Sequence, residues 1–133
     1  RENARRNGLE DRLDFICADV FELLPELKPE YDLIILDPPA FTKSRKTVLS
    51  AEKGYKEINL RALRLLPRGG YLATASCSHF MPSELFVSML RSAARDAGVE
   101  LRQIEARQQS PDHPILWNVP ETDYLKFYIF QVI

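Results

Sequence analysis

The chain has 133 residues, of which 45% are hydrophobic and 28% charged, and its formal net charge is −1. These values are typical of a soluble globular protein of one domain at most, which buries roughly two-thirds of the surface of its unfolded chain. No apolar run approaches the ~20 residues of a membrane span, and two cysteines give neither a disulfide framework nor a metal-ligand spacing. We therefore expect no membrane partner, no metal site and a reduced, cytoplasmic location.

The first thirty residues carry weak signals of secondary structure. Residues 1–8 are charged and helix-like, with Gly8 as a helix end and no capping signal before them, so we expect the chain to start inside a larger protein. Residues 13–20 have the composition of a strand that ends at Asp19. Residues 21–27 indicate a short helix, broken by Pro25 and closed near Pro29.

The most informative stretch is the apolar run 33–36 followed by Asp37-Pro38-Pro39-Ala40-Phe41. Four branched residues between turn signals predict a strand buried on both faces, as in a parallel sheet. Asp37 then lies at its carboxyl end, where open α/β sheets place their ligands. The two prolines remove backbone donors and fix an extended path, which leaves carbonyls free to accept from a ligand. A carboxylate, free carbonyls and the Phe41 ring suit the amino edge and face of a nucleobase.

The remaining elements alternate along the chain. A polar loop over 42–50 precedes a helix over 51–66, a strand over 71–75 and a helix that has Pro82 in its first turn and ends at Gly98. Two further strands over 99–107 and 124–133 have no helical pattern between them, so they should be antiparallel. The order βαβαβαββ predicts an α/β sheet with an antiparallel end.

Ser76-Cys77-Ser78-His79 follows the strand over 71–75. A right-handed crossover places this strand beside the strand over 33–36, and neighbouring strands lie ~4.8 Å apart. Cys77 and Asp37 should therefore reach one small ligand, the thiolate to attack an electrophilic carbon and the acid to activate a heterocycle. An unpaired cysteine alone is more often a buried small hydrophobe, and we keep that interpretation for Cys17. The position opposite Asp37 favours the functional interpretation for Cys77.

Several interpretations stay open. Asp19 could cap the following helix or accept from an adenine amine or a ribose hydroxyl. Residues 41–70 hold eight Lys or Arg and two Glu, a net +6 that could meet phosphates, although charge alone favours a solvated helix face. A hydrolase dyad of Cys77 and His79 is disfavoured, because two-residue spacing on a turn seldom aligns thiol and imidazole. Aromatic residues such as Tyr55 and Trp117 more often pack in the core or within a loop than stack on nucleobases.

Taken together, these motifs resemble one family in order and spacing over nearly the whole chain. It is the class I S-adenosylmethionine (SAM)-dependent methyltransferases that modify 23S ribosomal RNA at cytosine carbon 5. The Asp-Pro-Pro motif alone is shared with amino- and guanine methyltransferases, and the ordered set is more specific. The set is Asp37-Pro38-Pro39-Ala40-Phe41, Gly54-Tyr55-Lys56-Glu57-Ile58-Asn59, residues 65–70, Ser76-Cys77-Ser78, Asp112-His113-Pro114 and Tyr124-Leu125-Lys126.

The resemblance implies a Rossmann-like sheet and a covalent mechanism. Cys77 would add to carbon 6 of a flipped cytosine, Asp37 would hold the pyrimidine edge, and elimination would release Cys77 after carbon 5 is methylated. By the same matching, Asp19, Asp37 and Pro38 would contact SAM. Pro39, Phe41 and Lys56 are the candidate substrate contacts, and Tyr55 and Asn59 match a motif without assigned roles.

Members of this family also carry a glycine-rich cofactor loop, an acidic strand end and usually an RNA-binding domain before the point where this sequence begins. The resemblance therefore predicts a partial catalytic domain over residues 1–133, truncated in its N-terminal half, with weak or absent SAM binding alone. The strand over 33–36 would then have an open apolar edge, which predicts a homodimer. RNA, the large-subunit ribosomal RNA in this family, is the expected substrate.

Two other functions remain possible from the sequence. The chain could belong to a methyltransferase that acts on an exocyclic amine or a guanine nitrogen, in which Asp37 and Phe41 matter and Cys77 is packing. It could also be a non-catalytic fragment that serves association or RNA docking.

Overall fold

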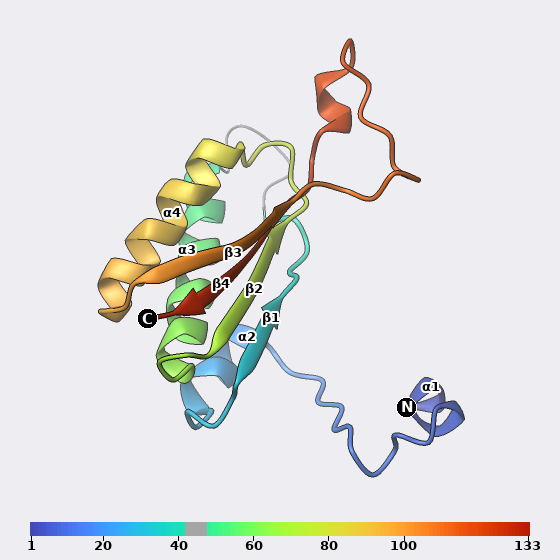
Figure 1. Cartoon of the computed structure of the whole chain (residues 1–133), viewed down its shortest axis with the longest axis vertical. Coiled ribbons are helices and arrows are strands. Elements are labelled where there is room, and N and C mark those ends of the chain that lie inside the picture. The colour runs from blue at the N-terminus through green and yellow to red at the C-terminus, as the bar shows by residue number, and fades with distance from the viewer. Residues whose placement is uncertain (42–47) are drawn as a thin grey trace.

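The computed structural model describes residues 1–41 and 48–133 and contains one four-stranded sheet of order β1-β2-β4-β3 (Figure 1). Strands β1 and β2 are parallel, and β4 is antiparallel to both β2 and β3. The α/β sheet with an antiparallel end is therefore confirmed. The strands are β1 (Leu33–Leu36), β2 (Tyr71–Ser76), β3 (Leu101–Arg107) and β4 (Lys126–Val132).

Two long helices, α3 (Val48–Leu65) and α4 (Ser83–Ala97), cover one face of this sheet (Figure 1). Apolar residues at helical spacing form the buried side of each helix, and they pack with Leu72 and Val132 of the strands. Gly98 ends α4 with a φ of +71°, a conformation that favours glycine. Helix α3 begins earlier than predicted, so residues 48–50 are helical, and the rest of the predicted loop lies outside the described residues.

Strand β1 is buried on one face only. Ile34 and Leu36 pack against the core, whereas Leu33 is 51% exposed and Ile35 65% exposed. The prediction of a strand buried on both faces is wrong, because side chains alternate along a strand and the long helices lie on one side of the sheet. β1 is also an edge strand, at one end of the sheet order, so its outer edge is open in the described part of the chain.

The predicted strand over residues 13–20 is also wrong. Residues 13–19 form no strand and are exposed, and they connect α1 (Glu2–Arg6), which lies apart from the sheet, to α2 (Val20–Leu23) (Figure 1). A strand needs a hydrogen-bonding neighbour, and the described sheet offers none to this segment. Cys17 lies in it and is exposed, so the expectation of a buried cysteine is corrected. The helix predicted over 21–27 is present as α2 and a 3₁₀ turn, η1 (Leu24–Glu26), which contains Pro25.

The connection between β3 and β4 projects from one end of the sheet (Figure 1). It contains a 3₁₀ turn, η3 (Pro120–Thr122), and the Trp117 side chain, which is 98% exposed rather than a core or loop plug. Thr122 holds the loop together, since its hydroxyl accepts from the Leu116 N–H at 2.8 Å and donates to the Val119 carbonyl at 2.7 Å. In the described part of the chain, no helix has the length and apolar content that a bilayer span requires.

Candidate active site

The two turns that carry Asp37 and Cys77 leave neighbouring parallel strands at the same end of the sheet. Asp37 follows the last residue of β1, and Cys77 follows the last residue of β2. The two strands are parallel neighbours, with Leu36 of β1 paired with Thr74 of β2. The predicted adjacency of these strands is confirmed, and both side chains are exposed. A carboxylate and a thiol are thus presented to solvent where open α/β sheets bind ligands.

A cavity of about 450 Å³ lies beside the first turn and is lined by five residues predicted to bind ligands. Its volume is in the range of small-molecule sites, and its walls are mostly apolar with carboxylates among them. Such a pocket fits an adenine ring, whose faces are apolar and whose amine can donate to a carboxylate. The lining residues are Asp19, Asp37, Pro38, Pro39 and Phe41, with Val20, Phe21, Leu24, Ile35, Leu36 and Ile58.

Asp19 has the capping role that the sequence left open. It is the N-cap of α2, and its Oδ1 accepts a hydrogen bond from the Phe21 N–H at 2.8 Å. It also lines the cavity, and a carboxylate has further acceptor capacity beyond one capping bond. The cap is therefore confirmed, and the contact with a cofactor stays a prediction.

Phe41 is held in place by other aromatic rings. Its ring centroid lies 4.6 Å from that of Tyr55, in an edge-to-face arrangement, and 5.9 Å from that of Phe21. Gly54 lies beneath it, and a Cβ at that position would be 3.5 Å from the Phe41 ring. The ring is thus a fixed wall of the cavity.

In the turn after β2, the two serines are buried and the cysteine between them is exposed. Ser76 is fully buried and Ser78 is 3% exposed, whereas Cys77 between them is exposed. The Ser76 hydroxyl donates to the Tyr55 hydroxyl at 3.1 Å and accepts from the Ser78 N–H at 3.4 Å. Cys77 is therefore not the buried small hydrophobe of the alternative interpretation, and its sulfur is accessible.

Lys126 is a further functional candidate, for which no role was predicted from the sequence. Its Nζ donates to the Ser78 carbonyl at 2.5 Å and to the Tyr124 carbonyl at 2.7 Å, and the residue is 6% exposed. Burial lowers the pKa of Lys126 to about 8, while the negative charges of Cys77 and Asp123 act in the opposite direction. The signals in the sequence were its place at the start of an apolar strand and in the Tyr124-Leu125-Lys126 motif, whereas its pairing with Ser76 across β2 and β4 was not visible there.

Two predicted site residues lie outside this cavity. Cys77 does not line it, and Lys56 forms an ion pair with Asp96 of α4, with 2.6 Å between Nζ and Oδ2. The Arg61 Nε pairs with Glu57 at 2.7 Å, so on α3 the basic segment largely forms a solvated, paired helix face. Lys43, Arg45 and Lys46 of the same segment lie outside the described residues.

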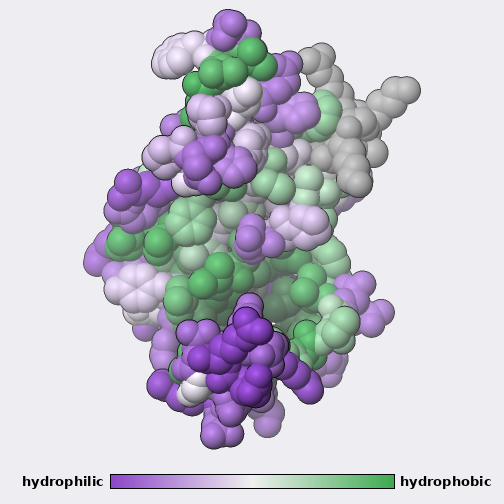
Figure 2. Space-filling view, turned by 90° about the vertical axis from the view of Figure 1, so that its right-hand side faces the viewer, coloured by the Kyte–Doolittle hydropathy of each residue, from purple (hydrophilic) through white to green (hydrophobic). Residues whose placement is uncertain are grey.

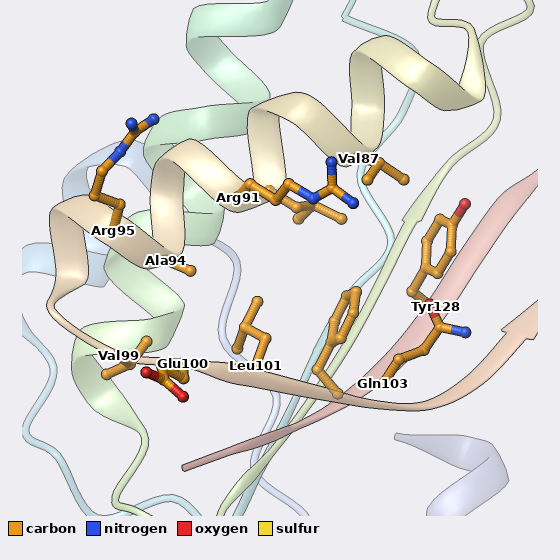
Figure 3. A pocket seen from close by; sticks show the side chains of 11 residues that line it. Val87, Arg91, Ala94, Arg95, Val99, Glu100, Leu101, Gln103 and Tyr128 are labelled. Atoms are coloured by element: carbon orange, nitrogen blue, oxygen red, sulfur yellow. The ribbon is translucent and has the colours of Figure 1, made fainter.

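A second cavity, of about 390 Å³, lies between α4 and the strands β3 and β4 (Figure 3). Arg91 and Arg95 of α4 and Leu101 and Gln103 of β3 are among its lining residues. None of the site residues predicted from the sequence lines this cavity, so it is not part of the candidate site.

Comparison with known proteins identifies relatives of this chain. No protein-family model matches the chain. It is 43% identical over 140 residues to ribosomal RNA large subunit methyltransferase I of Pseudoalteromonas atlantica, with 99% of this chain and 35% of that protein covered. The chain thus spans about a third of the length of the curated relatives that it matches.

Solved structures show the same fold. A SAM-dependent methyltransferase from Streptococcus mutans matches with a TM-score of 0.73 and 20% identity, over 99% of this chain and 35% of that one. SMU.776, a methyltransferase in complex with SAH, matches with a TM-score of 0.68 and 22% identity, over 99% of this chain and 36% of that one. The chain therefore has the α/β fold of SAM-dependent methyltransferases and is similar along its length to part of the ribosomal RNA large subunit methyltransferase I proteins.

Proposed function

We propose that this chain is the catalytic portion of a SAM-dependent ribosomal RNA methyltransferase that modifies carbon 5 of a cytosine through a covalent Cys77 adduct. One observation carries the proposal: exposed Cys77 and Asp37 end neighbouring parallel strands beside a pocket suited to a nucleoside. The similarity to ribosomal RNA large subunit methyltransferase I proteins supports the substrate class. Because the chain spans about a third of those proteins, the activity is proposed for the whole protein.

The residues around the 450 Å³ cavity fit part of a SAM molecule. Its apolar wall would take the adenine ring, Asp19 would accept from the amine or a ribose hydroxyl, and Pro38 and Asp37 would lie toward the reacting end. When bound, SAM supplies an electrophilic methyl group on a sulfonium. We propose that the residues of this chain alone bind it weakly, because resemblance to the family places further cofactor contacts in a glycine-rich loop that this sequence does not contain.

In the proposed reaction Cys77 is the nucleophile and Asp37 stabilises the ring that Cys77 has attacked. The Cys77 thiolate forms a bond to carbon 6 of cytosine, and the electron pair of the 5,6 double bond moves into the ring. The Asp37 carboxyl group hydrogen-bonds to the pyrimidine edge and stabilises the developing negative charge. Carbon 5 would take the methyl group from the sulfonium, whose sulfur would leave as a neutral thioether. A base would then remove the carbon 5 proton, and elimination would restore the double bond and release the Cys77 thiolate.

The test is to trap the adduct with the full-length protein. In RNA that contains 5-fluorocytosine, fluorine replaces the proton that must leave carbon 5, so the covalent complex should persist and cross-link at Cys77. The adduct should be lost in Cys77→Ser and retained in Cys17→Ser, a matched control because both cysteines are exposed. If Cys77→Ala retains full methylation, the carbon 5 chemistry is wrong.

One observation favours a second candidate, methylation of an exocyclic amine or a guanine nitrogen. The cavity contains Asp37, Pro38, Pro39 and Phe41 but not Cys77. A planar amine could be held by these groups without any nucleophile from the protein. In that case Cys77→Ala stays active, and the product nucleoside co-elutes in chromatography with a nitrogen-methylated standard rather than with 5-methylcytidine.

We also propose that the open edge and outer face of β1 bind a second copy of the chain. Apolar side chains gather in a band across this side of the molecule (Figure 2), and Leu33 and Ile35 are among the exposed large hydrophobic residues. An apolar edge strand invites pairing with another strand. Sedimentation of the chain tests this proposal.

A further inference from the structure

Tyr55 of α3 lies beneath both turns of the candidate site. It is fully buried, and its hydroxyl accepts a hydrogen bond of 3.1 Å from Ser76 Oγ. The backbone of Phe41 hydrogen-bonds to the same hydroxyl group. One oxygen atom of α3 is thus bonded to the turn after β1 and to the end of β2.

The Tyr55 ring is fixed as firmly as its hydroxyl. It packs edge-to-face against Phe41 on one side, with centroids 4.6 Å apart, and against Phe86 of α4 on another, with centroids 5.8 Å apart. Burial raises the pKa of Tyr55 above its ordinary value, so the hydroxyl is neutral at physiological pH. A buried neutral hydroxyl keeps its hydrogen-bond partners, because losing one leaves a polar group without compensation for its lost hydration.

A continuous hydrogen-bonded path therefore connects the two turns. It runs from the Phe41 backbone to the Tyr55 hydroxyl, on to Ser76 Oγ and then to the Ser78 N–H, with Cys77 between the last two residues. Asp37 lies at the other end, in the stiff Asp-Pro-Pro turn that leads to Phe41. The relative position of Asp37 and Cys77 thus depends on Tyr55, which is 18 residues from Asp37 and 22 residues from Cys77 in the sequence.

We propose that Tyr55 is a positioning residue that holds the Asp37 turn and the Cys77 turn at a fixed separation, so that both reach one cytosine ring. This inference rests on the proposed function, because it concerns the geometry of that reaction. Tyr55 touches neither substrate nor cofactor and acts through Phe41 and Ser76. A misplacement of reacting groups by about 1 Å can reduce a rate ~100-fold, so loss of this link should reduce turnover rather than binding.

The chain offers a matched control for a purely structural role. Thr74 Oγ1 donates to Asn59 Oδ1 at 2.8 Å, which is another buried hydrogen bond between the same strand and the same helix. Asn59 in turn donates from Nδ2 to the Tyr55 carbonyl at 2.8 Å. Neither of these two side-chain hydrogen bonds reaches the Asp37 turn or the Cys77 turn, so Thr74→Val removes a comparable buried bond without removing a bond to either turn.

The experiment compares Tyr55→Phe, Ser76→Ala, their double variant and Thr74→Val in the full-length protein. Tyr55→Phe keeps the ring packing and removes only the hydroxyl. We expect kcat to fall ~10–100-fold in Tyr55→Phe and Ser76→Ala while the KM for RNA changes less than about two-fold. The double variant should lose little more than either single one, because both remove the same link. Thr74→Val should lower the unfolding temperature to a similar extent and leave kcat within about two-fold.

The inference is overturned if Tyr55→Phe retains its kcat, or if Thr74→Val lowers kcat as much as Tyr55→Phe does. Its failure is separate from failure of the proposed function. Trapping of 5-fluorocytosine RNA by the unsubstituted protein, with its loss in Cys77→Ser, reports on the chemistry whatever Tyr55 does. If trapping succeeds and Tyr55→Phe traps at the unsubstituted rate, the chemistry is right and the positioning role is wrong.

Discussion

Lys126 Nζ donates a hydrogen bond of 2.5 Å to the carbonyl of Ser78, so the first residue of β4 holds the turn that carries Cys77. Its second bond, to the Tyr124 carbonyl, leaves the ammonium group buried between backbone oxygens. Loss of these two bonds would free the turn that presents the Cys77 sulfur, and a misplaced nucleophile reacts more slowly. Lys126→Met should therefore slow adduct formation with 5-fluorocytosine RNA, measured as the rate of cross-linking. A rate equal to that of the unsubstituted protein would contradict this assignment.

The same lysine should make stability depend on pH. Burial lowers its pKa from 10.5 to about 8 in the folded protein, so between these values the unfolded chain binds more protons than the folded one. The free energy of unfolding should therefore rise with pH from about 8 to 10.5, by at most ~1.4 kcal/mol per pH unit from this group. Below pH 8 Lys126 is protonated in both the folded and the unfolded state, so it no longer makes the free energy of unfolding depend on pH.

Urea unfolding at several pH values in this window checks the slope. The Lys126→Met variant should lack this part of the slope, whereas Lys53→Met, which removes an exposed lysine, should keep it. Equal slopes in the two variants would show that Lys126 titrates as an ordinary surface lysine.

Two substitutions at Asp19 separate its cap from its proposed cofactor contact. Asp19→Ala removes the cap of α2 and should lower the free energy of unfolding by about 1 kcal/mol. Asp19→Ser keeps a capping oxygen and should leave stability nearly unchanged, yet it removes the carboxylate that would accept from adenine or ribose. We expect both variants to weaken SAM binding several-fold in calorimetric titration of the full-length protein. Normal binding by Asp19→Ser would reduce Asp19 to a helix cap.

Trp117 is the only tryptophan of the chain and is 98% exposed. Its fluorescence should therefore have the maximum of a hydrated indole in the folded chain and shift little on unfolding. Iodide should quench it almost as efficiently as it quenches free tryptophan, and Trp117→Ala should change the free energy of unfolding by less than ~0.5 kcal/mol. A blue-shifted, protected emission would mean that the loop folds back or is covered by another molecule.

The proposed dimer can be tested on β1 itself. The chain should sediment as a dimer at high concentration, and Ile35→Lys should shift it toward the monomer, because a charge on an exposed edge strand opposes pairing. Leu49→Lys is a matched control, since Leu49 is 76% exposed on α3, away from β1. A monomer at all concentrations, or equal effects of the two substitutions, would contradict pairing through β1.

Local patterns were sufficient to predict the elements that carry the site. The apolar spacing of α3 and α4, the end of α4 at Gly98 and the Asp-Pro-Pro turn after β1 depend on neighbours a few residues apart. The same reasoning failed for residues 13–20, whose strand-like composition has no partner in the described sheet. It also failed for Ile35, because its exposure depends on whether another layer covers that face of β1.

The sequence by itself determined the order of the strands and helices from residue 33 onward, the adjacency of the two strands that Asp37 and Cys77 follow, and the family resemblance on which the proposed chemistry rests. Only the tertiary structure decided that Cys77 is exposed while Ser76 and Ser78 are buried, and that Lys126 holds a carbonyl 48 residues away. It also decided that Tyr55 joins the two turns by bonding to Ser76, 21 residues further along the chain. The physical reason is that periodicity and turn chemistry are local, whereas the partner of a buried polar group is set by packing between elements distant in sequence.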